Sequence, residues 1–596
     1  MRIAHLTTVD ISLRYLVLPQ LEAVNELGGE SIGISAPGEF VAELTGRGII
    51  HIPLTNSTRS VDLGKDARTI FELWRILRSE KPDVLHTHTP KPGIYGRIVG
   101  RLAGVPVVVN TIHGLYATRD DPFIKRAIVY TLEAIASRFS DRELVQSAED
   151  FKFVTDRRIT RRDRTILLGN GVDLSRFDPA RVDEATRRDL RASIGATDRD
   201  IVVGSVGRLV AEKGFPELFE AAGKLGDNCV MVAIGPDEPD KEDGLQAGFI
   251  AAARKQGIHL PGMQANVDEW YAAMDVFVLA SHREGFPRAA MEAASMGLPV
   301  IATDIRGCRE VVDHGVNGLL VPVNDPDGLA GAITELASSS EKRRKMGEAS
   351  REKALATFDE RRIVATVLKA QISALREKGH FHTIQGSDNF QLEIRQATQE
   401  DAAVIARLHA DSIDTGFLRT LGVGFLRRLY SALLDYEGAT ILVATDPYGP
   451  VAFVAGVNEV GAFYRHFATS KGLGAGVSAA PRLIRPSSWR KVWETATYDG
   501  DHQETGAELL SMAVADPYRR RGLGRSLSKK LLDELAGTGI LRVKVVVGAD
   551  NTPARSVYEA VGFIEKDAIE VHKGERSVVL VSDRGHEIAR PAGTPG

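Results

Sequence analysis

The segment SHREGFPRAAMEAASMGLPVIATDI, residues 281–305, follows a short apolar run at Val276–Leu279 that predicts a buried strand. Pro287 suits the first turn of a helix and Gly297 suits the position after its end, so we expect a helix over about 287–296. In a parallel, doubly wound sheet, the N-terminus of such a helix faces the crevice at the carboxyl ends of the strands, where ligands bind. Its free N–H groups and its dipole favour an anion there.

Two carboxylates frame this helix. Glu284 lies just before it, and Glu292 lies one to two turns inside it, eight residues further on. A carboxylate accepts hydrogen bonds from paired sugar hydroxyls, so two of them can hold two different sugars of one nucleotide-sugar. By itself, such a pair is usually a solvated helix face, and its meaning depends on the residues around it.

Strands and helices alternate on both sides of the segment, which predicts an α/β fold with parallel, doubly wound sheets. The first series has expected strands at Arg2–Thr7, Ser31–Ser35, Asp83–His86 and Val105–Asn110, and expected helices at Leu16–Leu27 and Ala67–Ser79. The second series starts near Ile201 and has further strands at Cys229–Ile234, Val276–Leu279, Val300–Thr303 and Gly318–Val321.

This pattern predicts several domains, because 596 residues are too many for one hydrophobic core. We expect α/β domains over 1–165 and 166–378, the second ending in a charged helix, Asp359–Lys378. A cluster of Gly, Ser, Asp and Asn predicts a linker over 379–391. A third α/β domain is expected over 392–585 and a disordered tail over 586–596.

Composition limits the possible partners and cellular location of the protein. A formal net charge of −4 gives no electrostatic reason to expect nucleic acid as a partner. Two cysteines, Cys229 and Cys308, form no disulfide framework and fit a reducing compartment. The start lacks the apolar core of a signal peptide, and no stretch approaches the length of a membrane span. We expect a cytoplasmic protein of undetermined oligomeric state. Contact with the inner face of a membrane is compatible with this, since lipid-linked substrates need no spanning helix.

Fixed cations follow another strand of the second series. The run GRLVAEKG places Arg208 and Lys213 after the strand that begins at Ile201, where they can neutralise charge on a leaving diphosphate. In the first series, NTIHGLY places His113 after the strand Val105–Asn110. Each residue alone is more often a surface charge or a core histidine, but their occurrence together at strand ends and helix starts indicates a binding site.

The segment with Glu284 and Glu292 resembles the E-x7-E signature of retaining glycosyltransferases of family 4, which have the GT-B fold of two Rossmann-like domains. The resemblance covers about 1–375. It implies that Glu284 contacts the transferred sugar and Glu292 the ribose of the nucleotide. It also implies contacts to sugar and diphosphate from Gly285, Phe286, Pro287, Arg208 and Lys213, to the base from the Gly235 turn, and to the reacting sugar from His113.

The acceptor side is described less closely by the resemblance. The run HTHTPKPGIYGR, His86–Arg97, is similar to the capsule and lipid-linked oligosaccharide branch of the family, which implies a lipid-linked or saccharide acceptor. After the first strand, TTVDISLRY departs from the Gly-Gly pair of many members, which leaves the geometry of this loop undecided. No Asp-x-Asp is present at a suitable place, so we expect a metal-independent reaction, with a UDP-sugar as the preferred donor.

The third domain contains a phosphate-binding pattern. Glu508–Ala515 alternates like a strand, and a helix is expected from about 524. Between them, Arg519, Gly522 and Gly524 form an R-x-x-G-x-G loop whose N–H groups can hold a pyrophosphate. Neighbouring positive charge comes from Arg520, Arg521 and Arg525. Downstream, in NTPARSVYEAVGF, Asn551 can cap a helix that carries Tyr558 and ends at Gly562.

These two motifs resemble those of the GNAT acetyltransferase superfamily over about 392–582. The resemblance implies an α/β acyltransferase domain that binds acetyl-CoA through the arginine–glycine loop, Met512, Val514 and Asn551, with Tyr558 protonating the leaving thiolate. A phenol is a suitable acid for a thiolate of comparable basicity. Glu508 is the first candidate for the general base, and Glu504, His502 or a water relay are alternatives.

An insertion over 457–500, containing Trp489, Trp493, Arg482 and Arg485, either shapes an acceptor pocket or is a surface loop. Taken together, the motifs predict a bifunctional transferase of surface-glycan biosynthesis that transfers a sugar with retention and acetylates an amine, most simply an amino sugar. Two alternatives are a glycosyltransferase fused to a protein-acetylating regulatory domain, and a chain in which one half is an inactive binding module.

Overall fold

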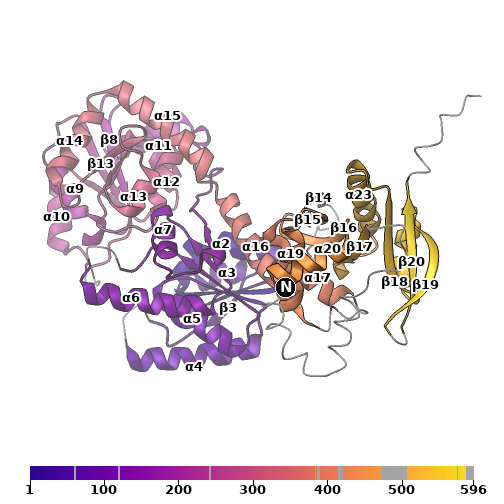
Figure 1. Cartoon of the computed structure of the whole chain (residues 1–596). Coiled ribbons are helices and arrows are strands. Elements are labelled where there is room, and N and C mark those ends of the chain that lie inside the picture. The colour runs from indigo at the N-terminus through magenta and orange to yellow at the C-terminus, as the bar shows by residue number, and fades with distance from the viewer. Residues whose placement is uncertain are drawn as a thin grey trace, which may run out of the picture. The chain divides into compact units, whose positions relative to one another are not determined.

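The structure is a computed structural model, and it describes residues 1–58, 62–117, 121–239, 243–382, 384, 390–413, 418, 421–471, 507–572 and 575–584. The chain divides into two compact units, Arg2–Leu368 and Lys369–Gly596, the latter together with Met1. The first unit runs from indigo to pink in Figure 1, and the second from orange to yellow. Each unit has its own sheets and core, which confirms the predicted α/β class.

The first sheet of the first unit is parallel, with the order β3-β2-β1-β4-β5-β6-β7. Its strands are β1 (Arg2–Val9), β2 (Glu30–Ala36), β3 (Ile50–Pro53), β4 (Val84–Thr87), β5 (Val107–Ile112), β6 (Arg142–Val145) and β7 (Thr165–Leu167). The order reverses between β1 and β4. The carboxyl ends of these two strands therefore lie at the point where doubly wound sheets open a crevice.

Helices cover both faces of this sheet. They are α1 (Asp10–Ser12), α2 (Leu18–Glu26), α3 (Val41–Gly46), α4 (Leu63–Glu80), α5 (Pro90–Ala103), α6 (Phe123–Ala136) and α7 (Ala148–Asp156). The helical stretch expected at Leu16–Leu27 begins earlier, at Asp10, and contains a π-helical turn, Leu13–Val17. Pro19 has no N–H to give to the preceding turn, which explains why the regular α-helix restarts there.

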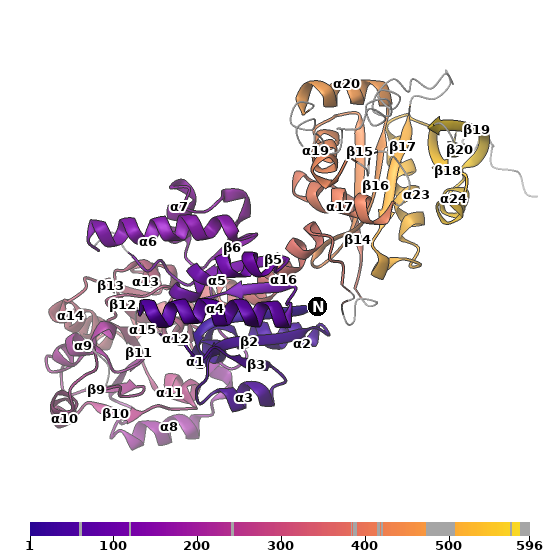
Figure 2. The same cartoon turned by 90° about the horizontal axis from the view of Figure 1, so that it is seen from below.

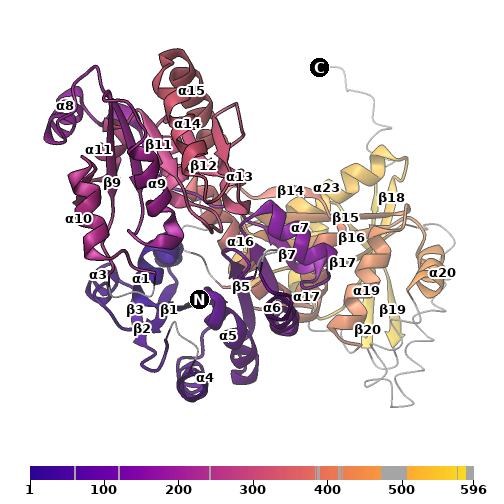
Figure 3. The same cartoon turned by 90° about the vertical axis from the view of Figure 1, so that its left-hand side faces the viewer.

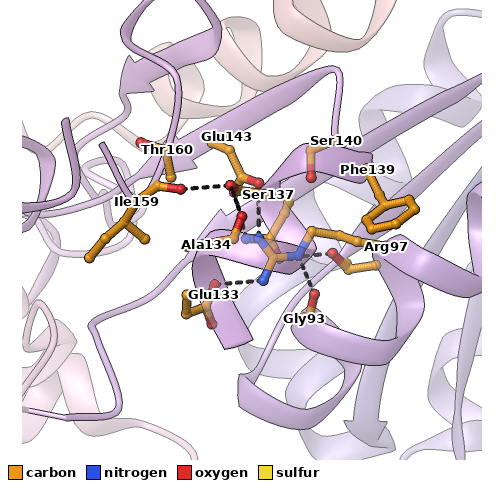
Figure 4. A network of polar contacts seen from close by, with 12 residues as sticks. Gly93, Arg97, Glu133, Ala134, Ser137, Phe139, Ser140, Glu143, Ile159 and Thr160 are labelled. Carbon is orange, nitrogen blue, oxygen red and sulfur yellow. Dashed lines mark hydrogen bonds and ion pairs between the residues drawn. The ribbon is translucent and has the colours of Figure 1, made fainter. Parts of the chain in front are cut away.

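A buried ion network joins α5, α6 and β6 (Figure 4). The Arg97 guanidinium is fully buried and lies 2.9 Å from Glu143 Oε1 and 2.5 Å from Glu133 Oε2. Its Nε donates to the Gly93 carbonyl, and Asn110 Nδ2 donates to the second oxygen of Glu143 at 2.8 Å. The network fixes the C-terminal end of α6 against the sheet.

The second sheet of the first unit is also parallel, with the order β10-β9-β8-β11-β12-β13. Its strands are β8 (Ile201–Val206), β9 (Cys229–Ile234), β10 (His259–Gly262), β11 (Val276–Leu279), β12 (Val300–Thr303) and β13 (Gly318–Val321). The helices are α8 (Glu184–Ser193), α9 (Phe215–Ala222), α10 (Ala247–Lys255), α11 (Val267–Ala273), α12 (Arg288–Ser295), α13 (Arg306–Val311), α14 (Pro326–Ala337) and α15 (Ser340–Thr357). The next helix, α16 (Glu360–Glu377), begins in the first unit and continues into the second. Figure 3 shows α9 and α14 beside these strands. Here the order reverses between β8 and β11, so the two segments with candidate residues leave the sheet side by side.

The second unit has a mixed sheet, β14-β15-β16-β17-β18-β20-β19, in which only β17 and β18 pair in parallel among the described ladders. Its strands are β14 (Glu393–Gln396), β15 (Ala439–Asp446), β16 (Gly449–Val457), β17 (Glu508–Val514), β18 (Arg542–Gly548), β19 (Ile564–His572) and β20 (Glu575–Asp583). The helices that pack on it are α17 (Ala402–Ser412), α19 (Val423–Leu434), α20 (Val460–Ser470), α23 (Leu523–Gly537) and α24 (Thr552–Glu559), seen in Figure 2.

One local expectation is refined in the second unit. The insertion expected over 457–500 begins with a regular helix, α20, rather than a loop, because Phe463 and Phe467 bury an apolar face on the core. Trp489, Trp493, Arg482 and Arg485 lie outside the described residues. Thr398 and Asp401 form a capping box at the start of the helical segment that follows β14. None of the described helices of either unit is long and apolar enough to cross a membrane.

Candidate functional site

Glu284 and Lys213 meet at the carboxyl ends of β11 and β8. Lys213 Nζ lies 2.6 Å from Glu284 Oε1, and the Ser281 hydroxyl donates to the same oxygen at 2.8 Å. Lys213 can approach because Gly214, at φ +71°, packs under the loop after β11. A Cβ at Gly214 would lie 2.0 Å from the Ala280 carbonyl oxygen. The sequence predicted both charged residues, and the structure brings them together as one ion pair.

Glu292 lies on α12 and is half-buried, with its side chain 15% exposed. The Tyr271 hydroxyl lies 3.0 Å from its Oε2, and Arg288 Nε lies 3.9 Å from its Oε1. Burial raises the pKa of the Glu292 carboxyl above its usual value, and the nearby Arg288 charge partly opposes this rise. Pro287, expected in the first turn, is instead the N-cap, and α12 begins at Arg288. Tyr271, on a different helix, was not predictable from the sequence as the partner of Glu292.

Arg208 and the Gly235 turn lie beside each other. A Cβ at Gly235, which has φ +152°, would lie 1.9 Å from the Gly207 carbonyl oxygen, so only glycine permits this approach. Arg208 Nη1 pairs with Glu238 Oε2 at 2.9 Å, and its side chain is 40% exposed. Arg208 therefore lies in the same loop cluster as Lys213 but with a partner of its own.

The loop after β5 touches the loop after β11. A Cβ at Gly285 would lie 1.8 Å from the His113 carbonyl oxygen, so the two backbones are in direct contact. On the other side, Asn170 Nδ2 donates to the Phe286 carbonyl at 3.2 Å. These contacts gather His113, Gly285, Phe286 and Glu284 at one place within the first unit.

A cavity of about 950 Å³ opens next to Glu284. Three ion pairs border it: Arg283 with Asp121 at 3.0 Å, Arg306 with Asp150 at 2.6 Å, and Arg309 with Glu149 at 2.8 Å. Tyr130 of α6 also lines it. The sequence showed none of these acidic residues as site candidates, because each stands alone and finds its arginine more than 150 positions away.

The loop after β1 departs from the usual glycine pair, and the structure shows what replaces it. Asp10 Oδ2 accepts from the Phe40 N–H at 2.8 Å, and Oδ1 accepts from the Ile11 N–H at 2.9 Å. A Cβ at Gly38 would lie 2.4 Å from Asp10 Oδ1. A carboxylate thus ties this loop to the segment after β2.

In the second unit, β17 and β18 diverge. Their parallel pairing covers Glu508 with Lys544 and Leu509 with Val545, and a bulge in β17 follows at Leu510. Beyond it, the sites predicted at Met512 and Val514 lie where the described ladders record no pairing of β17 with β18. The backbone edge of β17 is thus available to a ligand in this opening.

The arginine–glycine loop follows β17. Gly522 is the N-cap of α23 with φ +77°, and Arg520 has φ +64°, so the chain turns sharply before the helix. Arg519 Nε donates to the Val514 carbonyl at 3.2 Å. A Cβ at Gly524 would lie 3.4 Å from Met512 and Val557, at the limit of ordinary contact. Arg520 and Arg525 are exposed, Arg521 is half-buried, and the loop presents their charges at the start of α23.

Tyr558 is buried, and Glu508 is half-buried, with its side chain 13% exposed. Asn551 caps α24 by accepting from the Ala554 N–H at 3.2 Å, as predicted, and Tyr558 lies on that helix. Burial raises the pKa of the Tyr558 phenol. It also raises the pKa of the Glu508 carboxyl, against the opposing charge of Lys544 at 3.6 Å. The alternative bases Glu504 and His502 lie outside the described residues.

Comparisons with known proteins match the chain in three segments. A family model described as "Glycosyltransferase Family 4" matches 27–176, one described as "Glycosyl transferases group 1" matches 186–353, and one described as "FR47-like protein" matches 494–571. An Escherichia coli UDP-Gal:alpha-D-GlcNAc-diphosphoundecaprenol alpha-1,3-galactosyltransferase is 32% identical over 286 residues, which cover 47% of this chain and 72% of that protein. A GDP-mannose-dependent alpha-mannosyltransferase of Mycobacterium tuberculosis is 30% identical, covering 54% of this chain and 83% of that protein.

Solved structures are similar to the first unit. A glycosyltransferase from Rickettsia africae has a TM-score of 0.54 and 20% identity, covering 63% of this chain and 98% of that one. Anabaena Alr3699/HepE in complex with UDP-glucose has a TM-score of 0.52 and 21% identity, covering 62% of this chain and 100% of that one. At this identity the likeness concerns the fold.

Proposed function

Because this chain belongs to the family 4 glycosyltransferases, with the GT-B fold and a C-terminal FR47-like domain of GNAT type, we propose that it is a bifunctional transferase of surface-glycan biosynthesis. The predicted fold and the predicted fusion are confirmed. Our proposal adds that the first unit transfers a sugar with retention from a UDP-sugar to a lipid-linked or saccharide acceptor. The name of the E. coli relative, which gives UDP-Gal as its donor, supports this choice of donor.

The observation that carries the proposal is the Lys213–Glu284 pair, with the half-buried Glu292 eight residues after Glu284. In our proposal, Glu284 holds the transferred sugar and Glu292 the ribose. When the bond between the anomeric carbon and the phosphate breaks, negative charge passes to the diphosphate. Lys213 and Arg208 stabilise that charge, which is the effect expected of fixed cations at the end of a strand.

The second unit, we propose, binds acetyl-CoA with its pyrophosphate on the Arg519–Gly524 loop and acetylates an amine, most simply an amino sugar. The amine nitrogen attacks the thioester carbonyl, the C–S bond breaks, Glu508 takes the amine proton, and Tyr558 gives a proton to the thiolate. Burial of both groups supports these roles, because it favours an uncharged acid and a carboxylate of raised basicity.

Helix α6 is the feature that would bring a lipid-linked acceptor to the site. Its exposed apolar side chains are Phe123, Ile124, Ile128, Leu132 and Ile135. Lys125 and Arg126 lie among them, and Tyr130 of the same helix lines the cavity. Apolar residues mixed with cations on one surface helix are typical of peripheral membrane contact.

This contact can be measured by flotation with vesicles of phosphatidylglycerol and phosphatidylcholine. Phe123 and Ile124 are 75% and 72% exposed, so the double change Phe123→Ser with Ile124→Ser should reduce the bound fraction without unfolding the unit. Leu355→Ser, at a position 48% exposed on α15, should leave binding unchanged. Equal loss in both variants, or no vesicle binding by the wild type, rejects the role of α6.

The transferase proposal is tested with purified full-length protein. Calorimetry should show binding of UDP to one site and of CoA to another, and UDP should be released from UDP-galactose or a related donor in the presence of a lipid-linked acceptor pool. Labelled acetyl-CoA should transfer mass to amino sugars rather than to protein. If no UDP is released with any donor and acceptor, the first half of the proposal is rejected. If the label is found only on protein, the assignment of an amino sugar as the acetyl acceptor is rejected.

A further inference from the structure

A row of histidines lies behind the candidate sugar site. His5 of β1 and His86 of β4 are neighbours in register on the same face of the sheet. His88 follows two residues later, and His113 follows β5. His5, His86 and His88 are fully buried, whereas His113 is half-buried beside Gly285. The family resemblance assigns a role at the reacting sugar to His113 alone, so the other three imidazoles need a separate explanation.

Three of these rings form a hydrogen-bonded chain. His5 Nδ1 lies 3.0 Å from His88 Nε2, and His88 Nδ1 lies 3.0 Å from His113 Nε2. His86 packs against the chain, with ring centroids 4.2 Å from His88 and 4.9 Å from His5, and its Nε2 lies 2.7 Å from the Thr111 hydroxyl. The chain therefore leads from the interior of the sheet to the edge of the site.

The rings of the chain are neutral near pH 7. Burial lowers the pKa of His5 to about 3 and that of His113 to about 4. It lowers the pKa of His88 well below its usual value, and the neighbouring imidazoles lower it further. Each neutral ring has one N–H donor and one bare acceptor nitrogen. A ring that accepts a hydrogen bond on one nitrogen must therefore donate to the next ring from the other nitrogen.

The inner end of the chain decides that direction. Within the part of the chain that the structure describes, no partner lies within hydrogen-bond distance of His5 Nε2, which is fully buried. A buried N–H without an acceptor is rarer and more costly than an unused acceptor. His5 therefore carries its proton on Nδ1 and donates to His88 Nε2. His88 must then carry its proton on Nδ1 and donate to His113 Nε2.

We propose that His5 and His88 are positioning residues that hold His113 as a neutral imidazole with its proton on Nδ1, so that His113 donates a hydrogen bond to an oxygen of the bound sugar. The inference rests on the proposed place of His113 at the sugar site. Gln146 also hydrogen-bonds the His113 ring, and this bond raises the pKa of His113 against the larger lowering caused by burial.

Metal binding is the competing use of these residues, since nitrogens of His5, His86 and His88 lie within 4.8 Å of one another. In the chain, however, the bare nitrogen of His88 already accepts from His5. A metal ion would have to break that hydrogen bond and would bring two positive charges into a site without a buried carboxylate among the three ligands. Metal analysis of the purified protein is therefore part of the test.

The direct test is nitrogen NMR of full-length protein labelled at its 15 histidines, with the His113 signals assigned by comparison with His113→Asn. We expect His113 to show a protonated Nδ1 and a bare Nε2 at neutral pH. A proton on Nε2, a charged ring, or one equivalent of bound transition metal in the purified protein would overturn the proposal.

Variants of His5, which lies two rings away from His113 in the chain, supply the second test. His5→Leu removes the donor that orients His88, so the chain can reverse and the proton of His113 should move to Nε2. His5→Asn places an amide N–H near the position of Nδ1 and should preserve the wild-type tautomer. We expect kcat with UDP-galactose to fall about tenfold in His5→Leu and to recover in His5→Asn, with the Kd for UDP unchanged in both.

An unaltered His113 tautomer in His5→Leu, with UDP binding intact, contradicts the chain. If His5→Leu does not fold, the wild-type spectrum still decides. If wild-type protein neither binds UDP nor transfers sugar, the proposed function fails, while the tautomer measurement still reports on the chain separately.

Discussion

Glu284 and Glu292 are chemically identical side chains in different surroundings. Glu284 accepts hydrogen bonds from Lys213 and Ser281, which stabilise its charge, whereas Glu292 is enclosed and touches a neutral phenol. An anionic ligand near Glu284 can replace the Glu284 carboxylate as the partner of the Lys213 ammonium. Glu292 has no cation so close, and a sugar hydroxyl pair would add donors to the one that the Tyr271 hydroxyl supplies.

Glu292→Gln should therefore weaken nucleotide binding. The amide keeps the shape of the side chain but not the charge that strengthens hydrogen bonds from ribose hydroxyls, so the Kd for UDP should rise about tenfold. Calorimetry with UDP measures it. Glu335→Gln, at an exposed position of α14, is the matched control and should bind UDP as the wild type does. Unchanged affinity in Glu292→Gln would remove Glu292 from the site.

Glu508 should give the second unit a pH dependence. Because burial raises its pKa in the folded state, the folded protein holds a proton that the unfolded chain releases. Its contribution to stability is therefore present below the ordinary value of 4.5 and is lost as the pH rises through the raised, folded pKa. The rate of acetyl transfer should rise over the same window, since the base acts when ionised.

Thermal unfolding of wild type and Glu508→Gln at a series of pH values tests this. The difference in stability between them should shift in favour of Glu508→Gln with rising pH, and Glu508→Gln should lose the pH-dependent rate. Glu559→Gln, at a residue 52% exposed on α24, should show neither effect. A parallel pH profile for wild type and Glu508→Gln excludes Glu508 as the base.

At the scale of elements, helix α6 has two distinct faces. One face exposes apolar side chains, and the other is joined to the interior by the ion pair between Glu133 and Arg97 (Figure 4). Arg97 has two carboxylate partners, of which Glu143 is 2% exposed. Removing the cation would leave these charges buried without compensation, which is far more costly than losing a surface pair.

Arg97→Met should thus destabilise the first unit by about 3–5 kcal/mol, seen as a lower midpoint of unfolding. The exposed pair Arg344–Glu348 of α15, with side chains 61% and 64% exposed, offers the control. Arg344→Met should change stability by less than about 0.5 kcal/mol. A small effect in Arg97→Met would mean that water reaches the network.

At the scale of the whole molecule, the two candidate sites belong to separate units with separate cores. Lys213→Ala should lower sugar-transfer turnover through lost stabilisation of the leaving diphosphate and leave acetyl transfer unchanged. Tyr558→Phe should do the reverse. Both rates are measured on the same preparations. Equal loss of both activities in either variant would show that the sites are coupled.

Much of the site was predictable because the motifs are local. The loop after β11, the turn at Lys213 and the arginine–glycine loop each combine a charged residue with a glycine. At Gly214 and Gly522 this glycine has a positive φ, which other residues rarely adopt. The alternation of short apolar runs likewise predicted the two parallel sheets, because buried parallel strands are apolar on both faces.

The partners across the fold were not predictable. Tyr271 reaches Glu292 from another helix, Asp150 finds Arg306 over 156 positions, and His5 joins His88 over 83 positions. Each is an ordinary residue in its own segment, and only the strand order that puts β1 beside β4 makes His5 the end of a chain. The sequence by itself determined the fold class and the family, and it predicted the charged residues proposed for the donor side, since these depend on spacing along the chain. The tertiary structure alone decided the cavity, the hydrogen-bond direction at His113 and the burial that shifts the pKa values of Glu292 and Glu508, because those depend on groups that meet only when the sheets have assembled.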